Sequence, residues 1–173
     1  MEDITEATID SAWHPISQIT PEAARDGIAS IGETQAALID FFMPCSDALQ
    51  PEAKSCAVFL FYAAYRVFVS AYGEPRDKIE DDELEALYDM NESQLGDLET
   101  LDREAIAGGV KEGAFVQPHV IDFVADLLYG EVGAEDAEIG DNYEPYDRGM
   151  IFLLIKTVID AIDATLYNED KEA

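Results

Sequence analysis

The chain has 173 residues, of which 38 are Asp or Glu and 10 are Lys or Arg, so its formal net charge is -28. A surface this negative repels phosphate backbones and anionic membranes and attracts cations and basic proteins, which argues against direct binding of nucleic acid or of an acidic membrane. With 48% hydrophobic residues, the composition is that of a folded chain. The length fits one domain, and we expect a single helical domain over residues 1–173.

The sequence gives no sign of export or membrane insertion. The segment Met1–Glu6 has neither the positive flank nor the apolar run of a secretory signal, so the expected location is the cytoplasm. In that compartment Cys45 and Cys56 are expected to be free thiols. The most apolar stretch, 56–72, has 17 residues where a membrane span needs about 20, and it favours a buried helix.

Two helices are predicted in the first 45 residues. A short one covers 4–13 and ends before a His-Pro pair. The second begins with Thr20 as N-cap and Pro21 at the first helical position. Its apolar stripe keeps helical spacing as far as Pro44 and consists of Ile28, Ile31, Leu38 and Phe42. Gln35 is the one polar residue inside that stripe.

The central part of the chain predicts two long helices. The first, 51–72, is apolar on almost every side and is followed by Gly73, so we expect the other helices to enclose it. The second covers 79–107, where Asn91 and Gly96 leave a bend or break open. The residues expected on its buried side are Leu84, Leu87, Leu95, Leu98, Leu101 and Ala105.

The last third predicts two more helices and a loop. Pro118 opens a compact helix that reaches Tyr129, and an acidic loop is expected over 130–144. The final helix runs from about 145 to 167, and a frayed tail follows over 168–173. Its inward residues should be Ile151, Leu154, Ile155, Val158, Ile162 and Leu166, with Lys156, Asp160 and Asp163 outward. The fold class is therefore all-α, a bundle of about six helices around helix 51–72.

Acidic residues gather in the segment Glu80–Glu104, which holds 11 of the 38. If this segment is one helix, its 25 residues span about 37 Å, and the carboxylates lie about 3.4 Å apart along the axis. Phosphates along one DNA strand have a similar spacing of about 3.4 Å. One stripe would hold the partner-binding candidates Asp81, Glu85, Asp89, Glu92 and Glu99. The pattern fits a DNA mimic, and it equally fits a solvated helix face.

Candidate metal ligands occur in two places. A trio with helical spacing sits on helix 118–129, and an acidic group lies in or beside the loop, where oxygen ligands would suit calcium or magnesium. The candidates are His119, Asp122 and Asp126 in the trio, and Glu135, Asp136, Glu138 and Asp141 in the loop. The loop does not have EF-hand spacing, and the chain lacks zinc and di-iron motifs. Loose cation association and an ordinary exposed histidine remain the alternatives.

Arg66 is the most unusual base because it lies on the most apolar helix. If it is buried, it needs a carboxylate partner, and we expect a structural ion pair with Asp40, Asp122 or Asp126. Motifs for a catalytic nucleophile or for phosphate binding are absent, so nothing in the sequence argues for an enzyme or for a cofactor.

Two classes of function follow. The first is a non-enzymatic interaction or regulatory protein that binds a basic protein surface, in its sharpest form a DNA-mimic inhibitor of a DNA-binding protein. The alternative is a cytoplasmic helical adaptor or chaperone that binds through an apolar groove. Its charge would then reflect solubility or a salt-rich cytoplasm. The oligomeric state, and catalysis by carboxylates in an enclosed site, stay open.

Overall fold

The computed structural model describes residues 2–130 and 143–166. In these residues it contains eight α-helices, one π-helical segment and no strand, which confirms the all-α prediction. The elements are α1 (Glu6–Ile16), α2 (Pro21–Thr34), α3 (Ala36–Ser46), α4 (Pro51–Tyr72), α5 (Asp81–Leu95), α6 (Arg103–Lys111), α7 (Pro118–Tyr129), α8 (Pro145–Ala161) and η1 (Ile162–Leu166). The count exceeds six mainly because two of the predicted helices are each broken in two.

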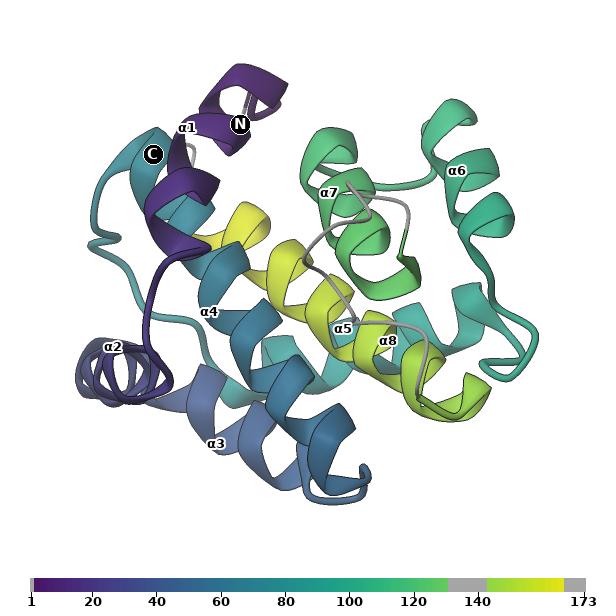
Figure 1. The fold of residues 1–173 in the computed structure, drawn as a ribbon, viewed down its shortest axis with the longest axis horizontal. Helices are drawn as coiled ribbons and strands as arrows, with labels where there is room; N and C mark the ends of the chain where they lie inside the picture. The colour runs from purple at the N-terminus through teal and green to yellow at the C-terminus, as the bar shows by residue number, and fades with distance from the viewer. Residues whose placement is uncertain (1, 131–142, 167–173) are drawn as a thin grey trace.

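The core of the bundle lies around α8 (Figure 1). Helices α4, α5 and α7 pack against it from different sides, and every residue from Ile151 to Ile162 is buried. Helix α4 has the predicted bounds and is also a core helix, but α8 is more fully enclosed. The predicted helix 145–167 continues beyond Ala161 as the π-helical turn η1. Most of the predicted loop 130–144 and all of the tail 168–173 lie outside the described residues.

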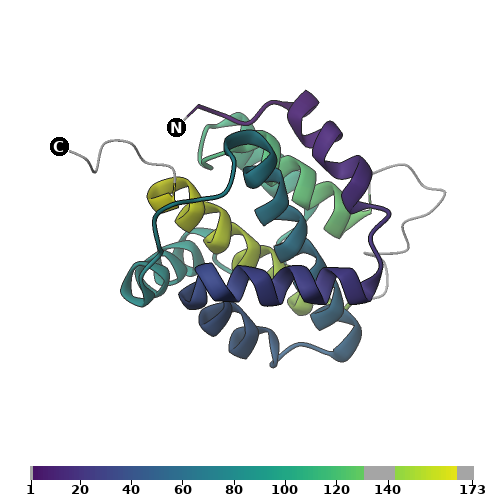
Figure 2. The same cartoon turned by 90° about the vertical axis from the view of Figure 1, so that its left-hand side faces the viewer.

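The predicted second helix is broken at Gln35, the polar residue in its apolar stripe. Gln35 has non-helical backbone angles, φ -129° and ψ 60°, and its side chain is buried. Its amide group donates to the carbonyl of Asp77 at 2.7 Å and accepts from the amide of Ile79 at 3.3 Å. The break therefore satisfies a buried amide and ties the start of α3 to the segment before α5. Figure 2 shows α2 crossing the bundle in front of α4.

The predicted helix 79–107 is broken at Gly96, where φ is 69°. Residues with a side chain rarely adopt this angle, so the glycine ends α5, and α6 starts at Arg103 after a turn. The turn packs closely on α8, because a Cβ at Gly149 would clash with the carbonyl of Leu98. The expected inner position Ala105 is exposed, and its neighbour Ile106 is buried in its place.

Helix α1 covers one side of α4 and α7. It reaches Ile16, three residues beyond the predicted end, with Pro15 in its last turn. The ring of Trp13 makes edge contacts with Phe59 of α4 at 6.0 Å and with Phe123 of α7 at 5.3 Å, measured between centroids. These contacts fix the angle at which α1 lies on the bundle.

Gln117 joins three distant parts of the chain. It has a left-handed backbone, with φ 49° and ψ 57°, and it is buried. Its side-chain oxygen accepts from the amide of Ile4 at 2.8 Å, and its nitrogen donates to the carbonyl of Glu2 and to the carboxylate of Asp163. These three hydrogen bonds hold a backbone conformation that is uncommon for a residue other than glycine.

Within the described ranges, α4 is the one helix that is long and apolar enough to cross a membrane by length and composition. Half of its most apolar 18-residue window is buried inside the fold. Core helices of soluble proteins pass the same test, so this feature is weak evidence for a membrane span.

Candidate functional site

Helix α5 presents carboxylates to solvent along one side. Asp81, Glu85, Asp89 and Glu92 are all exposed, at positions that recur every three or four residues. We call these four residues the acidic stripe. Its N-terminal end is favourable for acids, because negative charges near a helix N-terminus interact well with the helix dipole.

The fifth predicted member of the stripe, Glu99, lies beyond the break in the turn between α5 and α6. It is exposed, and its amide donates to the carboxylate of Asp97 at 3.0 Å. Helix α5 alone spans about 22 Å, against the ~37 Å expected for one unbroken helix. The structure therefore lacks the unbroken rod of carboxylates that the comparison with a DNA strand requires.

The acidic stripe borders a cleft between α3 and α5 with a volume of about 380 Å³. Asp40, Glu85 and Asp89 line it, and none of the lining residues within the described ranges is basic. The rings of Phe41 and Tyr88 also line it and meet edge to face at 5.8 Å. We call this hollow the acidic cleft. Acidic residues and aromatic rings that line one cleft suit a Lys or Arg side chain, which can form ion pairs and a cation–π contact.

The Tyr88 phenol, which lines the cleft, has a raised pKa chiefly because it is partly buried. Burial, followed by the charge of Glu92 and then of other nearby groups, raises the pKa of the Tyr88 phenol above its usual value. Burial also raises the pKa of Cys45, another lining residue. A thiol with a raised pKa stays protonated at neutral pH and is a poor nucleophile. The cleft is therefore equipped for binding a cation rather than for thiol chemistry.

The inner side of α5 is held by a buried polar cluster on α8. Lys156, predicted to face outward, is 3% exposed, and its ammonium donates to Asp160 and to the side-chain oxygen of Asn91, both at 2.7 Å. The nitrogen of Asn91 donates to Asp160 at 2.8 Å and to Thr157 at 3.2 Å. A Lys and an Asp four residues apart on a helix resemble a surface pair, which is why the outward prediction for both was wrong.

This cluster fixes the acidic stripe in place. Asn91 on α5 bonds to both members of the ion pair on α8, so α5 cannot rotate without breaking buried hydrogen bonds. A second tie lies at the start of α5, where Thr165 of η1 donates to the carboxylate of Glu83 at 3.1 Å. None of the cluster residues Asn91, Lys156 and Asp160 lines the acidic cleft. Their role in the described geometry is to position α5.

The candidate metal ligands do not form a metal site in the described part of the chain. Arg103 takes up two of them, because it donates to Asp122 at 2.8 Å and to Asp126 at 2.7 Å. His119 instead lies 3.4 Å from the carboxylate of Glu6, measured from Nδ1. Across residues 2–130 and 143–166, no three His, Cys, Asp or Glu side chains are grouped to hold a metal ion. The loop candidates Glu135, Asp136, Glu138 and Asp141 lie outside these ranges.

Arg66 does not form the buried ion pair expected for it. Its side chain is 43% exposed and lies 3.5 Å from the exposed carboxylate of Glu74. The expected partners Asp122 and Asp126 are bound to Arg103. Arg66 can avoid burial because its long side chain reaches water from a partly exposed position on α4.

Comparisons with protein family models, with curated proteins and with solved structures gave no match. The function is therefore argued from the geometry of the chain itself.

Proposed function

We propose that this protein is a non-enzymatic interaction protein that binds a basic protein surface through the acidic stripe and the acidic cleft. The observation that carries the proposal is the cleft, which three acidic residues from two helices line together with two aromatic rings, with no base among the described lining residues. A solvated helix face needs no such hollow. A Lys or Arg side chain of the partner would enter the cleft, while the rest of the stripe steers the approach.

The rigid support of α5 favours this proposal over adventitious acidity. The cluster around Lys156 and the tie from Thr165 hold the helix on its inner side, so the backbone positions that carry the outer carboxylates keep a fixed arrangement. Preformed arrangements bind with a smaller entropy cost than flexible ones. The proposal places the protein in the cytoplasm and leaves its oligomeric state open.

The test compares two variants with the same change in charge. The stripe variant carries Asp81→Asn, Glu85→Gln, Asp89→Asn and Glu92→Gln, which are all exposed positions. The control variant carries Asp10→Asn, Glu22→Gln, Asp26→Asn and Glu33→Gln, exposed positions on α1 and α2. Each set includes one acid in the first turn of a helix, so effects on helix stability are matched.

Immobilised parent protein is used to capture basic proteins from a lysate at low salt, and the affinity of each captured protein is then titrated. We expect the stripe variant to bind at least about fourfold more weakly, since four lost ion pairs contribute ~0.2–1 kcal/mol each. Binding by the parent should fall steeply with salt and compete with duplex DNA. If the stripe and control variants bind equally well, the stripe is only a solvated face.

The alternative function, an adaptor that uses an apolar groove, is favoured by a separate observation. A largely apolar pocket of about 530 Å³ lies between α2, α3 and α4. An adaptor that binds a partner there would show little salt dependence and would be sensitive to apolar substitutions in the pocket. The titration above therefore distinguishes the two functions.

A further inference from the structure

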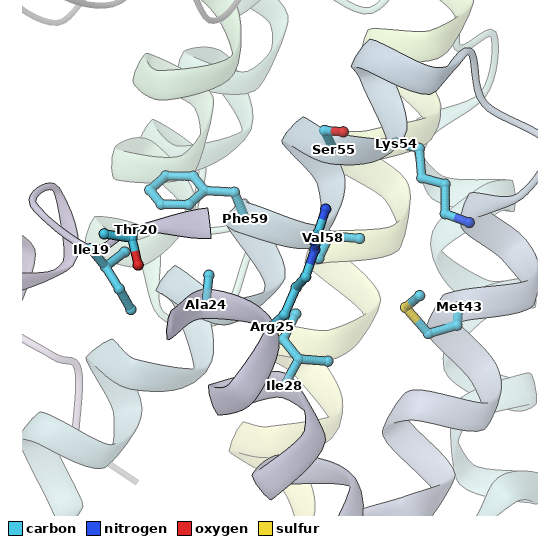
Figure 3. Close-up of a pocket in the computed structure, with 10 residues that line it drawn as sticks. All are labelled: Ile19, Thr20, Ala24, Arg25, Ile28, Met43, Lys54, Ser55, Val58 and Phe59. Atoms are coloured by element: carbon cyan, nitrogen blue, oxygen red, sulfur yellow. The ribbon is translucent and has the colours of Figure 1, made fainter. Parts of the chain in front are cut away.

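The pocket between α2, α3 and α4, which we call the apolar pocket, has the dimensions of a small-molecule site. Its volume of about 530 Å³ lies within the range of about 300–1,000 Å³ that is typical of ligand pockets. Figure 3 shows Phe59 near Ile19 and Thr20 at one end and Met43 near Lys54 at the other. Most of its wall is therefore apolar, and hydrocarbon placed there would be removed from water.

The charge around the apolar pocket is opposite to that of the chain. No acidic residue within 2–130 and 143–166 lines it, whereas two of the 10 basic residues of the chain, Arg25 and Lys54, do. Lys54 is paired with Asp47 outside the lining. The guanidinium of Arg25 makes no ion pair or hydrogen bond with the described part of the chain, and Figure 3 shows its side chain extending from α2 toward Val58 on α4. An available guanidinium beside an apolar hollow complements an anionic group.

Each of the two hydroxyl groups of the wall forms one hydrogen bond with the backbone of its own helix. Thr20 accepts from the amide of Ala23 at 3.2 Å as the N-cap of α2. Ser55 donates to the carbonyl of Pro51 at 3.1 Å. An extended peptide in the pocket would need a partner for each of its amide and carbonyl groups, and two hydroxyl groups are too few to supply them. A hydrocarbon chain needs none, so the lining favours an alkyl chain over an extended peptide.

We propose that the apolar pocket binds a small amphiphile, namely one alkyl chain of medium length that ends in a carboxylate. The chain lies against Ile28, Val58 and Phe59, and the carboxylate pairs with Arg25. This site is separate from the acidic cleft and shares no lining residue with it. The proposal therefore goes beyond the proposed function and does not depend on it.

The experiment titrates the full chain with dodecanoate, below the concentration at which it forms micelles, by calorimetry. Trp13 gives a second signal, since it is the single tryptophan of the chain and its ring contacts Phe59 of the pocket. Dodecyltrimethylammonium and dodecanol have the same chain with a cationic or a neutral head group. The net charge of -28 by itself favours the cation. We expect the reverse order, with dodecanoate binding most tightly and changing the fluorescence of Trp13.

Two substitutions locate the site. Arg25→Gln should weaken dodecanoate about two- to fivefold, the range for an exposed ion pair, and leave dodecanol unchanged. Arg76→Gln removes the same charge from an exposed position outside the pocket and should have no effect. Ala24→Phe fills the pocket from α2 and should abolish binding of dodecanoate. If Ala24→Phe changes the helical spectrum, Val58→Phe fills the pocket from α4 instead.

Three results would overturn the proposal. Tighter binding of the cationic or neutral amphiphile would show that Arg25 selects no anion. Unchanged binding by a folded, pocket-filled variant would place the ligand elsewhere. Absence of dodecanoate binding together with binding of an acidic amphipathic peptide would assign the pocket to a protein partner. None of these results bears on the acidic stripe, which is tested with different variants and probes.

Discussion

Two basic side chains join pairs of helices by the same chemistry at different depths. Lys156 joins α8 to α5 and is 3% exposed, whereas Arg103 joins α6 to α7 and is 17% exposed, with partners that reach solvent. Water can replace a partner of Arg103 but not readily one of Lys156. Although the chain has few basic residues, Lys156 stabilises its core and Arg103 attaches a peripheral helix. The cost of losing each base should follow its burial.

The largest effect should come from Lys156→Ala. Removing the ammonium leaves the carboxylate of Asp160 buried with Asn91 as its remaining strong partner, and breaking a buried ion pair in this way costs about 3–5 kcal/mol. Urea unfolding measures the free energy. Lys111→Ala, at an exposed position on α6, is the control. A loss below about 1 kcal/mol, the value for an exposed pair, would remove the distinction between the two sites.

Arg103→Ala should have an intermediate effect. It removes two charge-assisted hydrogen bonds that are partly open to water, so we expect a loss of about 1–2 kcal/mol. Amide protection from hydrogen exchange should be lost mainly in α6, because α6 packs chiefly on α7. Uniform loss of protection across α4 and α8 would contradict the view of α6 as a peripheral helix.

The region around Arg103 should also limit stability in alkali. Burial raises the pKa of Tyr129 to about 12, and its hydroxyl donates to the carbonyl of Leu101 at 3.2 Å. In the unfolded chain a tyrosine has a pKa of about 10. The stabilisation is therefore complete below pH 10 and is lost as the pH rises from about 10 to 12, because the unfolded state releases its proton first.

Unfolding midpoints in urea at pH 9, 10 and 11 measure this loss. Tyr129→Phe should be less stable than the parent at pH 9, because it lacks the hydrogen bond to Leu101, and should lose less stability between pH 9 and 11. Tyr146→Phe, at an exposed position, is the control. Equal slopes for Tyr129→Phe and the parent would show that this phenol is not responsible.

The smallest effect should come from Arg66→Ala. Its contact with Glu74 is long and exposed, so the loss of stability should lie below about 1 kcal/mol. The same urea titrations measure it. A loss as large as that of Lys156→Ala would restore the buried ion pair that the sequence suggested for Arg66.

Helix boundaries were predictable where local chemistry sets them. Helices α4 and α7 begin at Pro51 and Pro118 and are followed by Gly73 and Gly130, and the structure has the same bounds. These residues act through their own backbone angles, which depend little on the rest of the fold. For Gly96 the sequence left a bend or a break open, because a glycine permits the backbone angle of a helix end but does not require it.

The burial of polar groups was not predictable from spacing. Gln35 and Lys156 are buried because distant segments supply their partners, the carbonyl of Asp77 and the amide of Asn91. Spacing along one helix contains no information about such partners. The acidic stripe could be found from composition and period, whereas the acidic cleft also needs α3, which the sequence did not place beside α5.

The contacts of Gln117 bear on how the chain folds during synthesis. They join Glu2 and Ile4 to a residue more than 110 positions later, and that residue in turn to Asp163 beyond α8. During synthesis the segment around Ile4 therefore cannot make these contacts until Gln117 has been made, and Gln117 cannot bond to Asp163 until α8 has been made. Until α8 has been made, α4 and α5 lack the core helix against which both pack, and apolar faces left exposed in this way are prone to aggregation. Repulsion between the many carboxylates would keep nascent chains apart during this interval.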